Sequence, residues 1–189
     1  MRVPAQRGER RVCHRQRADG RFGSHHPLAS VASARARGTA MGIRGVGHTS
    51  ITVRDLDRAV NFYKLLGFED TGTRLHLDNE FIETLQAIPG ADITAAVLRL
   101  NDYSLEVIKY DAPTGYDHNP LRTSDVGGFH ICLMVDSADD EYARLKAAGM
   151  EFKSEVLDYD GGIRVVYGWD PDGNTIELLS QAPVPAGAG

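Results

Sequence analysis

The sequence predicts an α+β fold made of two β-α-β-β-β modules, the first over about residues 45–110 and the second over about residues 128–181. Three observations predict it: an internal repeat, apolar helical stripes that end at glycine, and short apolar strands between strong turn sequences. Two such modules can pair their sheets into a curved, partly open barrel with the helices outside.

The repeat covers the first strand and the helix of each module. The first copy is GHTSITVRDLDRAVNFYKLLGF, from residue 47, and the second is FHICLMVDSADDEYARLKAAGM, from residue 129. In both copies a histidine begins an apolar strand, a valine follows five residues later and a glycine nineteen residues later. The matched positions are His48 and His130, Val53 and Val135, and Gly67 and Gly149. Equal spacing predicts two structurally equivalent units.

Each copy continues into an amphipathic helix. Asp55 is a suitable N-cap for the first helix, and Gly67 is its C-terminal stop. Ser137 with Asp140 resembles a capping box at the start of the second helix, and Gly149 ends it. The apolar residues at helical spacing are Leu56, Ala59, Val60, Tyr63 and Leu66 in the first helix and Ala138, Tyr142 and Leu145 in the second.

Three strands are expected after each helix. In the first module they lie near residues 68–74, 93–100 and 103–110, the last two joined by a hairpin turn at Asn101-Asp102 and preceded by the short helix NEFIETLQAI. In the second module they lie near residues 151–157, 163–169 and 174–180. The turn sequences DGG, at residues 160–162, and DPDG, at residues 170–173, separate these last strands.

The first 40 residues differ in composition from the rest. They hold nine arginines, no lysine and two acidic residues, a charge of +7, whereas residues 41–189 hold 12 basic and 24 acidic residues, a charge of −12. We expect residues 1–40 to be a disordered Arg-rich extension, residues 41–181 the domain and residues 182–189 a flexible tail. Three origins fit the extension: an addition upstream of a start at Met41, a transit peptide, or a basic arm for nucleic acid or membranes.

Composition also indicates the cellular compartment and the kinds of partner to expect. No apolar stretch approaches the roughly 20 residues that span a bilayer, and we expect neither a membrane nor a nucleic-acid partner. The two cysteines, Cys13 and Cys132, fit no CxxC pattern, which argues against a disulfide framework and a cysteine zinc site. Cys132 lies in the apolar run HICLMV and is expected to be a small buried residue. This usage fits a soluble protein of the reducing cytoplasm.

Four polar residues interrupt the apolar strands at equivalent places. His48 and His130 begin the first strand of each module, while Glu106 in SLEVIKY and Glu177 in TIELLS lie in the last strands. A glutamate among apolar neighbours is costly to bury without a partner, and a metal ion removes that cost. Two imidazoles and two carboxylates suit one divalent ion, Zn, Ni, Co, Mn or Fe(II), and leave two open positions on an octahedral ion.

The segments GHTSITVRDLDRAVNFYKLLGF, SLEVIKY, GGFHICLMV and DPDGNTIELLS resemble the vicinal-oxygen-chelate superfamily, which includes glyoxalase I, methylmalonyl-CoA epimerase, extradiol dioxygenases and fosfomycin-resistance enzymes. The resemblance covers about residues 43–181. It implies that His48, His130 and Glu177 are metal ligands and that Glu106 occupies the second ligand position, which is glutamate in many glyoxalase-like members and glutamine in epimerase-like ones.

The resemblance leaves three functions open. The first is proton transfer through an enediolate, by an isomerase, epimerase or glyoxalase-like lyase acting on a small substrate with vicinal oxygens. Glu177 is then the first choice for the catalytic base and Glu106 the second. The second is extradiol ring cleavage, in which a fourth protein ligand would block a position needed for oxygen or substrate. The third is a non-catalytic, antibiotic-binding role, against which the complete ligand set argues.

Recognition of the substrate is less specified. The Asn-Trp-Gly element that usually follows the second ligand of glyoxalase I is replaced by IKYDAPTG, which puts glutathione recognition in doubt. The weaker candidates for substrate contact or acid–base chemistry are Glu80, Glu83, Tyr116 and His118, and the candidate anchors for an anionic group are Arg74, Arg99, Arg122 and Arg164. We expect a homodimer, with the site formed either within one chain or between units exchanged by two chains.

Overall fold

The computed structural model describes residues 43, 45–116 and 122–181, and all described helices and strands lie in the unit Arg44–Gly189. The predicted disordered extension over residues 1–40 and the predicted tail over residues 182–189 lie outside the described residues. None of the described helices has the length and hydrophobicity that crossing a bilayer requires.

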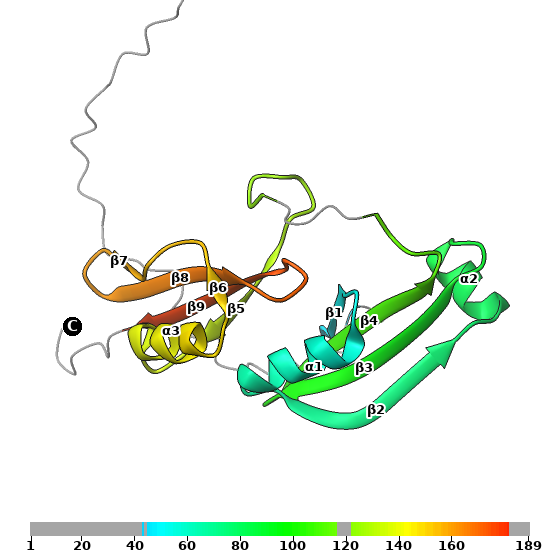
Figure 1. Ribbon diagram of the computed structural model, residues 1–189, viewed down its shortest axis with the longest axis horizontal. Coiled ribbons are helices and arrows are strands. Elements are labelled where there is room, and N and C mark those ends of the chain that lie inside the picture. Colours follow the sequence, from blue (N-terminus) through cyan, green and yellow to red (C-terminus); the bar gives the residue numbers. More distant parts are fainter. Residues whose placement is uncertain (1–42, 44, 117–121, 182–189) are drawn as a thin grey trace, which may run out of the picture. The chain divides into compact units, whose positions relative to one another are not determined.

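The first module forms a four-stranded sheet in the order β1-β4-β3-β2 (Figure 1). Its elements are β1 (Thr49–Thr52), α1 (Leu56–Leu65), β2 (Glu69–Leu77), α2 (Glu80–Gln86), β3 (Asp92–Leu100) and β4 (Tyr103–Ala112). Strand β1 pairs with β4 in parallel, whereas β3 pairs with both β2 and β4 in antiparallel fashion.

The second module repeats this plan in a five-stranded sheet of order β5-β9-β8-β6, with β7 also paired to β8. Its elements are β5 (His130–Met134), α3 (Ala138–Ala147), β6 (Glu151–Phe152), β7 (Leu157–Tyr159), β8 (Ile163–Trp169) and β9 (Thr175–Gln181). The first and last strands of this module, β5 and β9, are again parallel. The predicted α+β fold with two βαβββ modules is confirmed, and the described strands form two separate sheets rather than a closed barrel.

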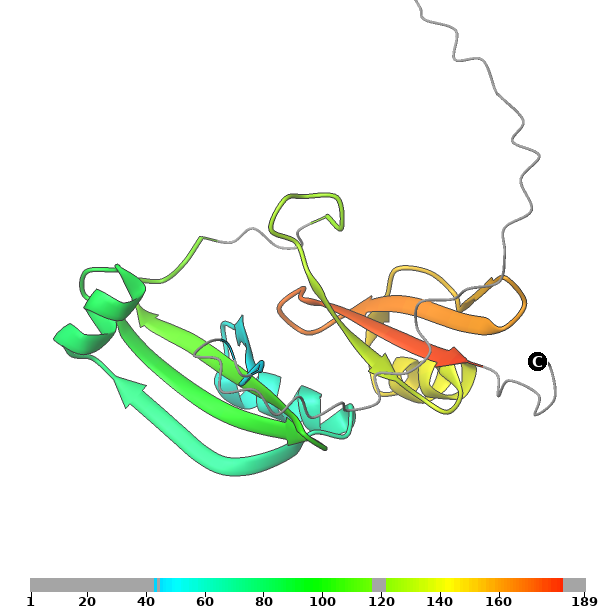
Figure 2. The same ribbon diagram turned by 180° about the vertical axis from the view of Figure 1, so that it is seen from behind.

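Local sequence signals define the two long helices. The Asp55 side chain accepts a hydrogen bond from the Arg58 N–H at 2.8 Å, and the Ser137 hydroxyl accepts one from the Asp140 N–H at 3.2 Å. Gly67 has a φ of 91° just after the first helix, a left-handed conformation that ends helices at low cost when the residue is glycine. Figures 1 and 2 show α1 beside the first sheet and α3 beside β8 and β9.

Strand β6 differs from its prediction. The sequence predicts a single strand over residues 151–157, but β6 ends at Phe152 and β7 starts at Leu157. Between them the Ser154 hydroxyl bonds to the backbone carbonyl of Glu155, a local contact that competes with strand pairing. The first module bends at the equivalent place, because the β2–β3 register shifts between Asp70 and Arg74 around Gly72.

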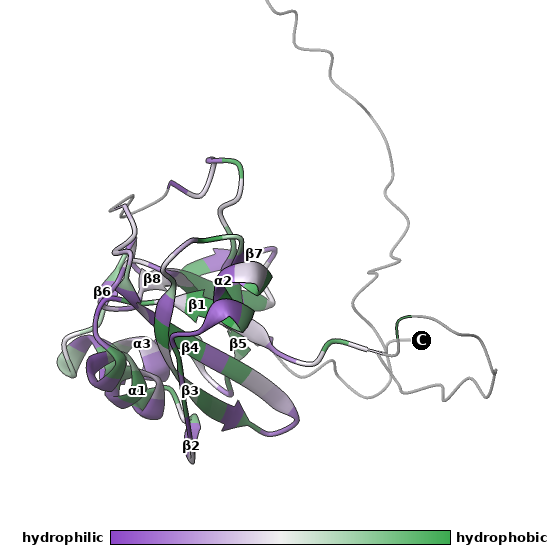
Figure 3. Cartoon of the chain, turned by 90° about the vertical axis from the view of Figure 1, so that its right-hand side faces the viewer, coloured by the Kyte–Doolittle hydropathy of each residue, from purple (hydrophilic) through white to green (hydrophobic). Residues whose placement is uncertain are grey.

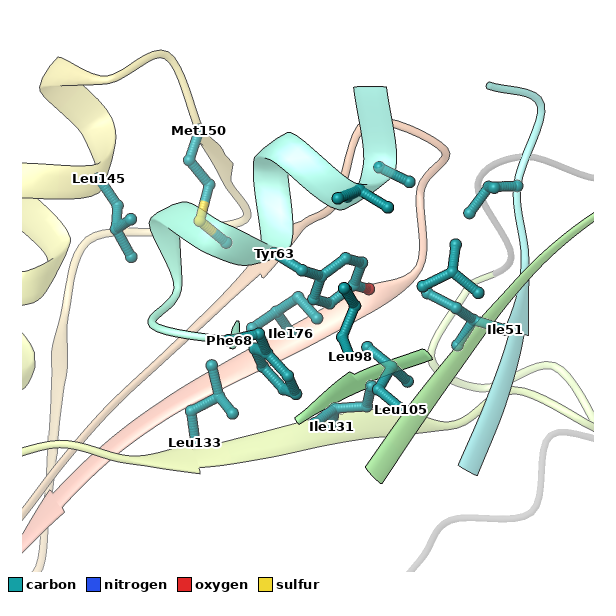
Figure 4. Close-up of a cluster of buried hydrophobic side chains, with 14 of the residues drawn as sticks. Ile51, Tyr63, Phe68, Leu98, Leu105, Ile131, Leu133, Leu145, Met150 and Ile176 are labelled. Carbon is teal, nitrogen blue, oxygen red and sulfur yellow. The ribbon is translucent and has the colours of Figure 1, made fainter. Parts of the chain in front are cut away.

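The core lies on the helix-covered faces of both sheets. One cluster of buried side chains includes residues from both modules (Figure 4). They come from α1, β1, β3 and β4 of the first module and from α3, β5, β8 and β9 of the second. Tyr63, Leu98, Leu105, Leu145, Ile176 and Leu178 are among its most buried members. Helices α1 and α3 each have hydrophilic as well as hydrophobic residues (Figure 3), as expected when one helix face packs on this core.

Polar contacts also join the two modules. The Tyr63 hydroxyl on α1 donates a hydrogen bond to Oδ2 of Asp170 at 3.0 Å. Asp172, in the same turn between β8 and β9, accepts hydrogen bonds from Arg54 at 3.0 Å and from Arg58 at 2.7 Å. The turn sequence DPDGN therefore fixes α1 of the first module against the second module, in addition to joining two strands.

The opposite faces of the sheets are covered unequally. In the first module α2 places Ile82 in a second buried cluster with Ile93, Ala95 and Ile108, so that it covers part of this face. The second module has no corresponding helix among the described residues, and Met134, Leu157 and Tyr159 are exposed. The candidate site lies on these opposite faces.

Candidate metal centre

His48 and Glu106 form the first of two pairs. Their Nε2 and Oε2 atoms are 3.5 Å apart. His48 directly precedes β1, and Ser50 pairs with Glu106 across the parallel β1–β4 contact. Because side chains two residues apart in a strand share a face, the histidine and the glutamate emerge on the same side of the sheet.

His130 and Glu177 form the second pair, with Nε2 and Oε2 3.0 Å apart. Cys132, two residues after His130, pairs with Glu177 across the parallel β5–β9 contact. In each module, the residue that pairs with the glutamate lies two positions after the histidine. The repeat predicted from sequence is therefore reproduced in the register of the strands.

The four predicted ligands lie as two separate pairs. Within residues 43, 45–116 and 122–181, no group of three or more His, Cys, Asp or Glu side chains is arranged to hold a metal ion. Each pair supplies one imidazole nitrogen and one carboxylate oxygen, and the combined set of two of each suits a divalent ion. Glu177 is only 8% exposed, and a nearby cation would offset the cost of burying its charge. The residues present fit such an ion once the two pairs meet.

The second pair has two further neighbours on its sheet face. The Tyr167 ring lies with its centroid 5.3 Å from that of His130. Cys132 is exposed, so the expectation that it is a buried apolar residue is wrong; the alternation of β5 places Ile131 and Leu133 in the core and Cys132 on the other side. Partial burial, followed by the charge of Glu177, raises the pKa of the Cys132 thiol to about 11, which keeps it protonated near neutral pH.

Most of the arginines expected as anion anchors are engaged elsewhere. Arg74 pairs with Asp70, Arg122 with Asp125 and Arg164 with Asp139, each through a contact of 2.6–2.7 Å. Arg99 is exposed and has no ion pair among the described residues. Arg122 nevertheless lines the same cavity as His130.

The remaining candidates are more distant or lie elsewhere. Glu80 and Glu83 are in the first turn of α2, where they have no described contact with either pair. Tyr116 lines the cavity, and His118 lies outside the described residues.

A cavity of about 940 Å³ opens beside the second pair. Its wall includes Thr52 and Lys109 from the first module and His130 and Thr175 from the second. Thr123 also lines it, and this residue contacts Lys153, which sequence reasoning did not single out. The only sequence signal for Lys153 was its position in EFKSE, two residues beyond the start of a predicted strand.

Comparison with known proteins places this geometry in a family. A model of the Glyoxalase/Bleomycin resistance protein/Dioxygenase superfamily matches residues 45–178. A lactoylglutathione lyase of Schizosaccharomyces pombe is 31% identical over 153 residues, which cover 76% of this chain and 50% of the relative. The chain therefore spans about half the length of that relative.

Two further proteins are similar over more of their own length. A 2-epi-5-epi-valiolone epimerase of an Actinomyces species is 33% identical over 162 residues, which cover 79% of this chain and 86% of the relative. The crystal structure of a glyoxalase family protein from Bacillus cereus has a TM-score of 0.70 at 22% identity and covers 79% of this chain and 100% of that chain. By the match of the family model and by the epimerase relative, the chain belongs to the glyoxalase/bleomycin resistance protein/dioxygenase superfamily, the vicinal-oxygen-chelate proteins.

Proposed function

We propose that the protein is a metal-dependent enzyme that transfers a proton within a small substrate bearing two neighbouring oxygen atoms. The observation that supports this best is the occurrence of one histidine–glutamate pair, in the same strand register, in each of the two modules. A single such pair would be an ordinary polar contact, but two equivalent pairs provide a complete set of four ligands.

The residues that would hold the ion are His48, Glu106, His130 and Glu177. A divalent ion, Zn, Ni, Co, Mn or Fe(II), would act when bound as a Lewis acid that makes a C–H bond beside a substrate carbonyl more acidic. With four protein ligands, the ion would retain room to bind the two substrate oxygens.

We propose that the complete centre forms between two copies of the chain. The pairs are not grouped within the described part of one chain, so the first module of one copy would meet the second module of its partner. A two-fold symmetric homodimer makes two identical centres in this way, because each contact occurs twice. This arrangement uses all four ligands of each chain.

The carboxylates carry out the proton steps. Glu177 is the first choice as base: its side chain is 11% exposed against 20% for Glu106, so it is better shielded from competing water. Its carboxylate takes the proton from the carbon beside the carbonyl, which leaves the enediolate form of the substrate. Return of that proton to the neighbouring carbon gives an isomerase or lyase-type product. Inversion at the same carbon instead requires Glu106 to start as the protonated acid, so that it gives its own proton to the other face while Glu177 keeps the one it removed.

Both outcomes have named relatives, a lactoylglutathione lyase and a 2-epi-5-epi-valiolone epimerase. The substrate class common to the two reactions is a small molecule with adjacent oxygens. We therefore propose the proton-transfer step and leave the two products as alternatives of the same chemistry.

The experiment is C–H exchange in D₂O. Protein reconstituted with each candidate metal is incubated with a panel of 2-keto, 2-hydroxy and thioester substrates, and loss of the C–H signal is followed by NMR. Exchange that falls at least about 100-fold in Glu177→Gln and is kept in Glu141→Gln on α3 supports the proposal. Absence of exchange together with oxygen uptake on catechols in Fe(II) would overturn it.

A further inference from the structure

Lys153 lies on the same sheet face as the second histidine–glutamate pair. Its backbone N–H bonds to the carbonyl of Tyr167 at 2.8 Å, and Tyr167 in turn pairs with Glu177 on the next strand. Directly paired residues of neighbouring strands project to the same side. Lys153, Tyr167 and Glu177 therefore form a row across the sheet.

The ammonium group of Lys153 is held by hydroxyls and aromatic rings. Its Nζ atom is 3.0 Å from Oγ1 of Thr175 and 3.1 Å from Oγ1 of Thr123. It also lies 5.6 Å from the ring centre of Tyr167 and 5.4 Å from that of Trp169, distances at which a cation is attracted to the ring face. These contacts fix the position of the charge and leave it unneutralised.

Lys153 differs in this respect from the cations that have acidic partners. Arg74, Arg122, Arg164 and Lys146 each pair with a carboxylate, whereas no carboxylate lies within ion-pair distance of Lys153 in residues 45–116 and 122–181. Burial lowers the pKa of Lys153 from its ordinary value, with no acidic neighbour to oppose the shift. An anion at this point would relieve a charge that the described residues leave unbalanced.

Several hydrogen-bond donors around Lys153 also lack an acceptor. The ammonium has three N–H donors and uses two of them on Thr175 and Thr123. Both threonine hydroxyls accept from Lys153, so their own O–H groups remain available to donate. The indole N–H of Trp169 is buried and has no partner among the described residues. Thr123 and Thr175 line the cavity beside His130, so a ligand in that cavity can reach them.

We propose that Lys153, Thr175 and Thr123 form a subsite that binds a carboxylate group of the substrate. One ammonium supplies a single positive charge, which matches a carboxylate, and the nearby Arg122 is already neutralised by Asp125 through Nε at 3.0 Å and a second nitrogen at 2.7 Å. Thr175 stands two residues along β9 from Glu177, a separation of about 7 Å. The carboxylate is therefore a remote group that orients the substrate, distinct from the oxygens at the reacting carbon. The role of this subsite in turnover rests on the proposed function, whereas the binding of a carboxylate at the subsite does not.

Trp169 allows the subsite to be tested without catalysis, because it is the only tryptophan of the chain. The full chain is titrated with acetate, malonate and inorganic phosphate while its tryptophan fluorescence is recorded, with and without added Zn or Mn. Lys153→Met keeps the apolar stem against the rings and removes the charge, Lys153→Arg restores the charge, and Lys146→Met on α3 is the matched control.

We expect the carboxylates to change the fluorescence saturably and Lys153→Met to weaken their binding at least about tenfold, as loss of a hydrogen bond to a charged group does. Lys153→Arg recovers most of the affinity, and Lys146→Met binds like the parent protein. Equal binding by Lys153→Met, or no saturable response, would overturn the subsite. Phosphate binding that is clearly tighter than malonate binding would overturn the assignment to carboxylates.

A second measurement separates this inference from the proposed function. If exchange is found, Lys153→Met should raise KM for a carboxylate-bearing substrate with little change in kcat and leave a neutral substrate unaffected. Loss of kcat on both substrates would contradict an orienting role. If no exchange is found with any substrate, the proposed function fails while the fluorescence titration still decides the subsite.

Discussion

The hydroxyl group of Tyr63 donates a hydrogen bond to Oδ2 of Asp170 over 3.0 Å, which connects α1 of the first module to the turn between β8 and β9 of the second. Tyr63 is fully buried, and its ring also packs edge-on against Phe68, with centroids 5.5 Å apart. The backbone N–H groups of Asp172 and Asn174 bond to the other oxygen of Asp170. This contact is therefore part of a network that holds the modules together.

Tyr63→Phe is expected to lower the free energy of unfolding by about 1–3 kcal/mol, the usual effect of removing a hydrogen bond to a charged group. Asp170 keeps its other donors, so the protein should still fold. Urea denaturation followed by circular dichroism measures the change. Tyr159→Phe is the control, because Tyr159 is 63% exposed and its hydroxyl has no hydrogen bond to a described residue. A loss as large in the control would show that the contact to Asp170 is not the cause.

The same contact has a predictable pH dependence. Burial, followed by the charge of Asp170, raises the pKa of Tyr63 well above its ordinary value. A folded pKa above the unfolded one gives stability that is fully present below the unfolded value of about 10 and is lost as the pH rises through the folded value. The difference between the parent protein and Tyr63→Phe should thus stay constant from about pH 6 to pH 9 and shrink above about pH 10. A difference that already shrinks between about pH 6 and pH 8 would contradict this assignment.

Gly168, in β8, is packed so closely by its neighbours that even a methyl side chain would collide with them. A Cβ atom there would lie 2.7 Å from the Glu151 carbonyl oxygen and 2.7 Å from Cε of Met150. Gly168→Ala should therefore destabilise the protein by about 1–3 kcal/mol, the range for overpacking a core. Gly162→Ala is the matched control, because a Cβ at Gly162 meets no atom within 4 Å. Thermal unfolding of both variants compares them, and equal melting temperatures would refute the close packing of β6 on β8.

Substitution of either glutamate of the proposed centre should lower C–H exchange, whereas substitution of a surface glutamate should not. Glu177→Gln should reduce C–H exchange by about 10²- to 10⁴-fold, the range for losing a general base, while the chain stays folded. Glu106→Ala, which leaves no oxygen ligand at this position, should reduce metal content as well as exchange. Glu141→Gln is the control, because Glu141 pairs with Arg144 on the surface of α3. Metal analysis and NMR exchange give the two readouts, and full activity with undiminished metal in Glu106→Ala would remove Glu106 from the ligand set.

Local signals were sufficient to predict much of the fold. Asp55 and Ser137 cap helices through their own side chains, and Gly67 ends one by its left-handed conformation, so a few neighbouring residues determine each boundary. The pairing of each histidine with its glutamate was also predictable. Equal spacing in two repeats reports equal strand register, even though the partners are 58 residues apart in one module and 47 in the other, as their numbers show.

Other features depend on contacts that the sequence does not display. After His130 the run ICLMV is apolar throughout, so its hydrophobicity does not distinguish the core residues from the exposed Cys132. The surroundings of Lys153 result from pairing with β8, a strand that begins ten residues later in the chain. The distribution of the ligands into two pairs could not be predicted either, because it depends on how whole modules pack.

The most direct test of the proposed two-chain centre is complementation between His48→Gln and His130→Gln. Each variant alone lacks one ligand in every centre and should be inactive. When the two chains are unfolded together and refolded, half of the dimers are mixed, and each mixed dimer holds one intact centre and one centre with both changes. We expect recovery of about a quarter of the parent's C–H exchange and metal content. Recovery no greater than the sum of the two separate variants, in a preparation shown to contain mixed dimers, would contradict it.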